Sequence, residues 1–140
     1  MKKLFILVIA LMSFNSFAQK VEKDLKYYYY FVNQDKDFIT YLKAKKEFEL
    51  KKYNFRLPNS KEAVREIEIY QDKILKNQKT YAEFLRRYEM KNAEEYAELW
   101  FNQIISLKTF IKKNPEFYKL SAKDRQNIID KWYYTEFAAN

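Results

Sequence analysis

The chain has 140 residues and a formal charge of +8, with 27 Lys and Arg against 19 Asp and Glu, and it contains no Cys, His or Gly. Without Gly, tight hairpin turns, phosphate loops and nucleophile elbows have no ready source, which excludes a mostly β fold. Without Cys there are no disulfides and no thiol for lipid attachment, and without His no side chain transfers protons readily near neutral pH.

The first 18 residues have the pattern of an export signal. Two lysines precede an apolar run from Leu4 to Met12, and small residues up to Ala18 suit a cleavage site. The run is shorter than the ~20 residues that span a bilayer. We therefore predict a cleavable signal peptide at 1–18 and a single all-helical domain at 19–140. We expect no transmembrane segment after cleavage, and a periplasmic or secreted protein.

Apolar residues in 21–32 are spaced by four and three positions, which predicts the first helix of the mature protein. This stretch contains five consecutive aromatic residues, from Tyr27 to Phe31. Successive residues on a helix lie ~100° apart, so these side chains cannot all face one core. We expect some of them to be exposed or to contact a second surface.

A second helix is expected to run to about Asn54 after a turn at 33–37, with Asp35 or Asp37 as its cap. One face of this helix is apolar and the other is rich in lysine. The apolar stripe consists of Phe38, Tyr41, Leu42, Phe48 and Phe55. Residues 19–57 carry the largest basic excess in the mature chain, which favours acidic partners.

The stretch 59–90 has the strongest helical period in the chain. Its apolar residues recur every three or four positions and so form one continuous stripe, the apolar seam, along one face of a helix. Ile74 and Tyr81, for example, are one heptad apart. We therefore predict one continuous helix with a capping box that begins at Asn59. A break near Asn77 is the alternative.

After 59–90 the apolar residues no longer follow the same helical spacing. This indicates a turn and a new helix over 92–113 with Asn92 as its cap. This helix is apolar almost all the way round, so we expect it to be the most buried one, with Trp100 in the core. The predicted fold is all-α: a compact bundle of about four long helices and one short helix around one core. Its centre is an antiparallel hairpin of about 59–90 and 92–113.

The last segments follow from local signals. Asn114 and Pro115 end the preceding helix and begin a short one, and Ser121 caps the final helix. The expected inward face of that helix consists of Ile128, Ile129, Trp132, Tyr133 and Phe137.

The sequence from Leu120 to Gln126, Leu-Ser-Ala-Lys-Asp-Arg-Gln, resembles the Leu-Thr-x-x-Gln element of the small periplasmic helical chaperones related to Spy. Asp124 stands where that family has Gln. The resemblance implies an exported, basic, all-helical chaperone and assigns no site residue.

We expect no catalytic activity, no cofactor and no metal site. The densest acidic cluster, Glu94, Glu95 and Glu98, is typical of a solvated first helical turn stabilised by the helix dipole. A carboxylate-only hydrolase with Glu83 or Glu98 as a buried general acid is the remaining catalytic alternative.

The predicted function is recognition of an acidic macromolecule, an acidic protein or envelope surface rather than a nucleic acid, through a basic, tyrosine-rich face. The alternatives are a Spy-like chaperone or envelope-associated protein, and an immunity or inhibitor protein against a periplasmic toxin. The two parts of this face would be adjacent if the first two helices form a hairpin. The alternative for the lysines is that they only keep the protein soluble. The candidate binding residues are Tyr27, Tyr28, Tyr29, Tyr30, Lys45, Lys46, Lys51, Lys52 and Arg56. The sequence makes no prediction of oligomeric state.

Overall fold

The fold is all-α in the residues that the computed structural model describes, 23–137, and these contain no strand. The predicted signal peptide and its cleavage site lie outside the described residues. In chain order the elements are α2 (Leu25–Phe31), the 3-10 turn η1 (Val32–Gln34), α3 (Lys36–Lys51), the 3-10 turn η2 (Lys52–Asn54), α4 (Lys61–Ile74), α5 (Gln78–Arg87), α6 (Ala93–Lys113), α7 (Pro115–Lys119) and α8 (Ala122–Phe137). The predicted all-α fold class is confirmed.

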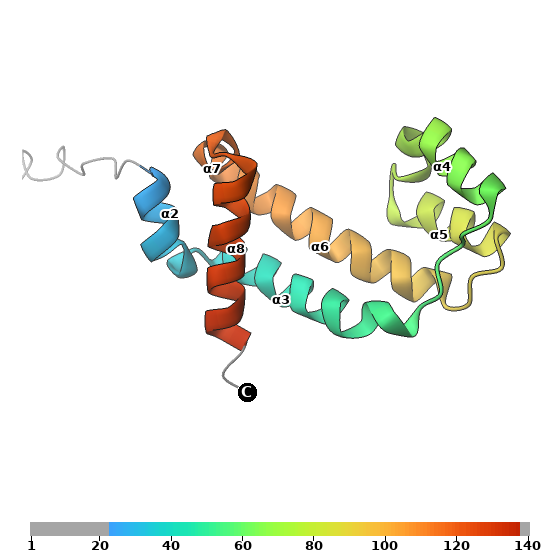
Figure 1. The fold of residues 1–140 in the computed structure, drawn as a ribbon, viewed down its shortest axis with the longest axis horizontal. Coiled ribbons are helices and arrows are strands. Elements are labelled where there is room, and N and C mark those ends of the chain that lie inside the picture. The colour runs from blue at the N-terminus through green and yellow to red at the C-terminus, as the bar shows by residue number, and fades with distance from the viewer. Residues whose placement is uncertain (1–22, 138–140) are drawn as a thin grey trace, which may run out of the picture.

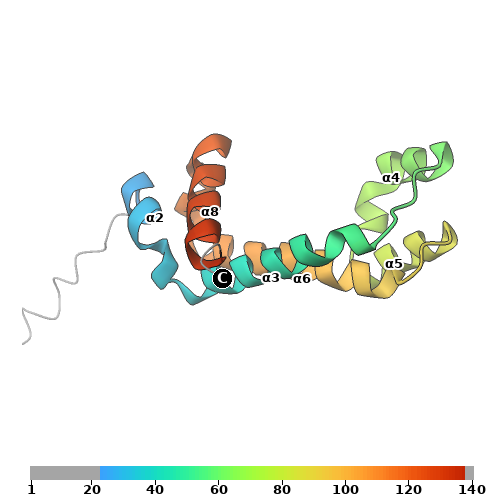
Figure 2. The same ribbon diagram turned by 60° about the horizontal axis from the view of Figure 1, so that its bottom comes forward.

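The long helices α3 and α6 lie side by side and antiparallel through the middle of the molecule (Figures 1 and 2). Helices α2, α7 and α8 surround one end of this pair, and α4 and α5 pack at the other. Buried residues accordingly form two clusters rather than the single core we expected, because the α3–α6 pair separates the helices packed at its two ends.

We name the two clusters by the helices that close them. The α8 core contains Tyr28, Val32, Phe38, Tyr41, Leu42, Phe110, Phe117, Ile128, Ile129 and Trp132. The α5 core contains Ala63, Ile74, Tyr81, Ala82, Phe84, Leu85, Met90, Ala93, Tyr96, Ala97 and Phe101.

The prediction of a continuous helix over 59–90 is wrong. The segment breaks after Ile74, and α4 folds back beside α5. Asn77 caps the new helix: its side-chain oxygen accepts from the Thr80 backbone N–H at 2.9 Å, and its own N–H donates to the Thr80 hydroxyl oxygen at 3.2 Å. This local capping box outweighs the continuous apolar seam. The first cap of the segment is Ser60, one residue later than predicted.

Helix α6 begins and ends where predicted and contributes buried residues to both cores. The turn before it uses left-handed backbone at Glu89 (φ 58°) and Asn92 (φ 56°). Asn tolerates this conformation better than most residues, which explains its use in a chain without Gly. Asn92 therefore holds the N-cap position by its backbone, and its side chain makes no capping hydrogen bond.

Trp100 is less buried than we expected from the sequence. It is half-buried and packs on Tyr81 and Phe101, with ring centroids 5.2 and 5.0 Å away. Phe110, by contrast, is 0% exposed. The loss of stability for Trp100→Ala should therefore fall below the ~3–5 kcal/mol of a fully buried aromatic residue.

The buried side chain of Asn114, at the end of α6, forms hydrogen bonds with two residues from the first part of the described chain. Asn114, 1% exposed, donates to an Asp35 side-chain oxygen at 2.9 Å and accepts from Lys23 Nζ at 2.6 Å. The other Asp35 oxygen caps α3, as predicted, by accepting from the N–H groups of Asp37 and Phe38. The predicted Ser121 cap of α8 is also present.

The buried tyrosines predict unfolding in alkali. Burial raises the pKa of Tyr28 and of Tyr41 from 10.0 to about 12, with smaller contributions from nearby carboxylates. Since the folded-state pKa is the higher one, this stabilisation is complete below pH 10 and is lost as the pH rises from 10 towards 12. A pH titration followed by circular dichroism and phenolate absorbance should show helix loss in that window. Full helicity above pH 12, with these phenols ionised, would contradict the prediction.

Candidate binding surface

Helix α2 presents most of its aromatic residues to solvent. Within Leu25–Phe31 only Tyr28 is buried, and Tyr27 is half-buried. We call the remaining large apolar side chains the α2 aromatic face. It consists of Leu25 (42% exposed), Tyr29 (39%), Tyr30 (59%) and Phe31 (50%). The expectation that five successive aromatics cannot share one core is confirmed.

Tyr28 anchors this short helix to the α8 core. Its ring meets those of Phe110 and Phe117 edge-on, with centroids 6.4 and 5.1 Å apart. Trp132 Nε1 donates to the Tyr28 backbone carbonyl at 3.3 Å. Because the anchor fixes the rotation of α2, Tyr29 and Tyr30 are directed outwards.

Lys131 of α8 secures the exposed side of α2. Its ammonium group lies 3.9 Å from the centre of the Tyr29 ring, 4.8 Å from Tyr30 and 4.6 Å from Trp132. It also donates to the Tyr29 backbone carbonyl. An ammonium group over several aromatic faces is a favourable cation–π arrangement. This contact could not be predicted from the sequence, because the partners are 102 positions apart.

A depression of about 270 Å³ lies between α2 and α8 beside this contact. Its lining combines apolar, basic and acidic groups: Leu25, Lys26, Tyr29, Tyr30, Asp124 and Asn127. The α2 aromatic face is therefore not flat, and it offers hydrogen-bonding groups next to aromatic rings.

Lys45, Lys46 and Lys51 lie on α3, and Lys52 begins η2 directly after it; we call these four residues the α3 lysines. Carboxylates partly neutralise three of them. Lys45 is 3.6 Å from Glu49, and Lys52 pairs with the same carboxylate. Lys51 is 3.1 Å from Glu47 and 3.9 Å from Glu95 of α6. The hydrogen bond that Lys51 donates to Glu47 raises the pKa of Lys51, and the one that Lys52 donates to Glu49 raises the pKa of Lys52, so both remain charged.

Two further predicted residues are arranged differently. The Lys46 ammonium group lies 4.5 Å from the centre of the Phe137 ring, and Lys45 lies 5.6 Å from that of Tyr133. Arg56 is exposed in the segment between η2 and α4.

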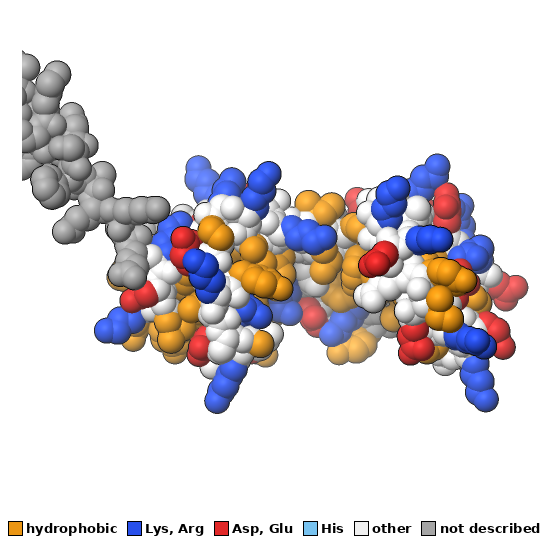
Figure 3. All heavy atoms as spheres, turned by 90° about the horizontal axis from the view of Figure 1, so that it is seen from above, with side chains coloured by type: hydrophobic (Ala, Val, Ile, Leu, Met, Phe, Trp, Pro, Cys, Tyr) orange, Lys and Arg blue, Asp and Glu red, His pale blue; other side chains and the backbone are white. Residues whose placement is uncertain are grey.

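The structure does not bring the predicted tyrosines and lysines together. The hairpin of the first two helices that we required is absent, and α8 lies between them: Lys131 contacts α2, while Tyr133 and Phe137 contact the α3 lysines. Tyr28 contacts Phe110 of α6 and Phe117 of α7, and the turn η1 separates α2 from α3. On the face shown in Figure 3, Lys and Arg side chains are spread over both ends of the molecule instead of gathering at one.

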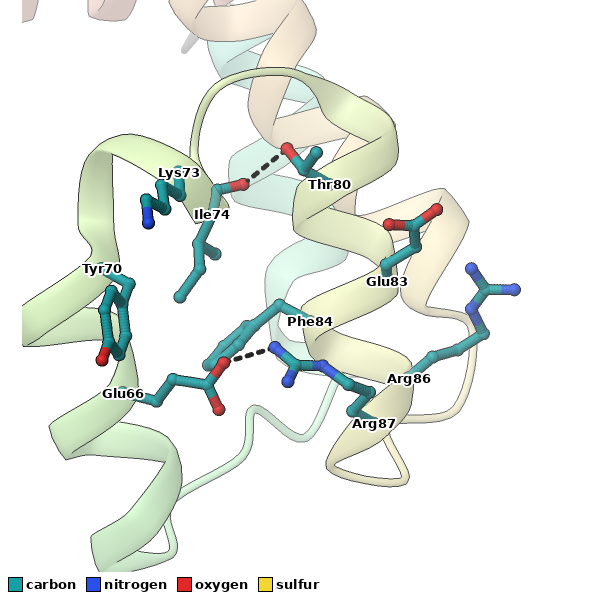
Figure 4. A pocket seen from close by; sticks show the side chains of 9 residues that line it. All are labelled: Glu66, Tyr70, Lys73, Ile74, Thr80, Glu83, Phe84, Arg86 and Arg87. Carbon is teal, nitrogen blue, oxygen red and sulfur yellow. Dashed lines mark hydrogen bonds and ion pairs between the residues drawn. The ribbon is translucent and has the colours of Figure 1, made fainter.

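A second concave surface, which the sequence did not indicate, lies between α4 and α5 (Figure 4). It has a volume of about 730 Å³. Phe84 and Ile74 face its interior, and Glu66 of α4 reaches across it to Arg87 of α5. Glu66 also accepts from the Tyr88 hydroxyl at 2.7 Å, and this hydrogen bond is the main reason that its pKa is lowered. The cleft exists because α4 folds back on α5. It therefore depends on the helix break after Ile74, which the continuous apolar pattern of the sequence did not predict.

Among residues 23–137 no three acidic side chains lie close enough together to hold a metal ion. Within the same range no helix has the length and apolar character needed to cross a membrane. Comparison of the chain with protein-family models, curated proteins and solved structures finds no match.

Proposed function

We propose that this chain is an exported, non-catalytic binding protein that recognises an acidic macromolecule, with the α2 aromatic face as its main contact. The supporting observation is that four of the seven residues of α2 are large apolar side chains that remain exposed. Exposed tyrosines supply contact area at little conformational cost and are enriched at the centres of interfaces.

Charge supports an acidic partner over a neutral one. Without the predicted signal peptide and its two lysines, the chain has a formal charge of +6. The α3 lysines lie on the other side of α8 from the aromatic face, so we assign them to steering the partner rather than to direct contact. Charges outside a contact mainly raise the rate of association.

Two other functions share this surface chemistry. A chaperone or envelope-associated protein is favoured by exposed apolar side chains far from α2, among them Leu50, Tyr53 and Leu57. An immunity or inhibitor protein would be a special case of the proposed function, with one tight partner. These possibilities differ in the number of partners and in their response to salt.

The test is a pull-down from envelope extract at low and high salt, with partners identified by mass spectrometry. We expect wild-type protein to retain one acidic partner in near-stoichiometric amount, and a Tyr30→Ser, Phe31→Ser variant to lose it. Tyr53→Ser is the matched control, because Tyr53 is 84% exposed but lies at the opposite end of α3 from α2. Retention of the partner by the α2 variant would refute the assigned surface. Many weak partners, all released by salt, would favour the chaperone alternative.

A further inference from the structure

Helix α4 is the least embedded long helix of the molecule. It packs chiefly against α5 and stands away from the α3–α6 pair (Figures 1 and 2). Only Ala63 and Ile74 of its residues are buried. Val64, Ile69 and Tyr70 remain 45%, 58% and 49% exposed. Moving α4 away from α5 would therefore disrupt few contacts outside this helix pair.

The connection between α4 and α5 is compatible with helix. It consists of Leu75, Lys76 and Asn77, with neither Gly nor Pro. The apolar seam remains in phase across it, because Ile74 and Tyr81 are one heptad apart. The break is held by the Asn77–Thr80 capping box and by a hydrogen bond from the Thr80 hydroxyl to the Ile74 carbonyl at 2.9 Å (Figure 4). The side chains of Asn77 and Thr80 thus stabilise the break, although the apolar pattern of the sequence favours one continuous helix.

The contacts between α4 and α5 are complementary and do not require both helices to come from one chain. Helix α4 supplies the Glu66 carboxylate, and the partner segment supplies the Arg87 guanidinium and the Tyr88 hydroxyl. Ile74 and Phe84 fill the cleft between them. Helix α4 is kinked at Tyr70 (φ −114°, ψ 25°), and straightening requires this residue to become helical as well. If α4 and α5 then formed one helix, α4 would extend ~20 Å beyond its own α5, and its place would be open to α4 of another molecule.

We propose that the α4–α5 break is a hinge, and that two copies of the chain form a dimer by straightening it and exchanging α4. The partner at the α4–α5 cleft is then a second copy, which restores the Glu66 contacts between chains. Short connections that can straighten are a common origin of domain-swapped dimers. This proposal is independent of the α2 aromatic face.

Three variants test the hinge. Asn77→Ala with Thr80→Ala removes the capping box and leaves residues that favour helix. Gln78→Pro has the opposite effect, since Pro is favoured at the first position of α5 but disrupts a continuous helix. The extended backbone of Asn77 (φ −156°, ψ 170°) suits a residue before Pro. Ser60→Ala is the control, because it removes the N-cap of α4 without affecting the hinge, whose capping box belongs to α5.

The measurement is the dimer fraction by size-exclusion chromatography with light scattering, after refolding at high protein concentration. We expect the Asn77→Ala, Thr80→Ala variant to raise the dimer association constant about tenfold. Ser60→Ala should resemble wild type, and Gln78→Pro should be monomeric. Equal dimer fractions in the capping-box variant and Ser60→Ala would overturn the proposal. If the capping-box variant does not fold, wild type and Gln78→Pro decide: a wild-type dimer that Gln78→Pro abolishes supports the hinge, and equal dimer fractions overturn it.

Discussion

Replacing Phe110 by Ala should lower the free energy of unfolding by about 3–5 kcal/mol, the largest effect we expect from a single substitution in this chain. Phe110 is 0% exposed and touches three other rings of the α8 core, with centroids 6.4 Å away at Tyr28, 5.2 Å at Phe38 and 5.1 Å at Phe117. These rings come from three different helices, so the cavity cannot close by moving one of them. The total free energy of unfolding of a small domain is only about 5–15 kcal/mol.

Urea denaturation followed by circular dichroism measures this loss. Ile105→Ala is the control, since Ile105 lies on the same helix but is 56% exposed, and it should cost less than about 1 kcal/mol. Similar midpoints for the two variants would show that the ring cluster around Phe110 does not carry the stability of this end of the molecule.

Asn114→Ala should cost about 3 kcal/mol, although it removes only a small polar group. The change leaves an Asp35 oxygen and the Lys23 ammonium group without their partner in a partly buried site. Asp35 also caps α3, so its displacement would weaken the start of that helix.

Asn102→Ala is the matched control for this polar site. Asn102 is exposed on the same helix, α6, and its substitution should leave stability within about 0.5 kcal/mol of wild type. Thermal unfolding compares the two variants. An Asn114→Ala protein as stable as Asn102→Ala would mean that solvent replaces the lost hydrogen bonds at no cost.

The sequence predicted helix ends best where the determining contacts are local. Asp35 and Ser121 were recognised as caps because each bonds to backbone within three residues. At Asn77 two local patterns conflicted, a capping box and a continuous seam. The capping box and the packing of α4 on α5 together decide this conflict, and residue spacing alone could not show that packing.

The candidate surface was predictable only in part. The ~100° step of a helix predicts that some of the five aromatics are exposed, but which ones depends on the direction of α2, which the step does not give. That direction depends on Tyr28 entering a core built from α3, α6, α7 and α8, and on Lys131, more than one hundred positions away. The pairing of Lys51 with Glu95 is also non-local. From the sequence we therefore expected more unpaired positive charge on the α3 lysines than the structure shows.

The central claim is that an acidic partner is steered by charge and held by the α2 aromatic face. It is tested most directly by association and dissociation rates of the captured partner with wild type and with a variant in which Lys45, Lys46, Lys51 and Lys52 are replaced by Gln. We expect this variant to fold normally and to associate more slowly, with a smaller change in dissociation. We also expect the wild-type association rate to fall towards the variant's as salt is added. Unchanged association at physiological ionic strength would contradict it.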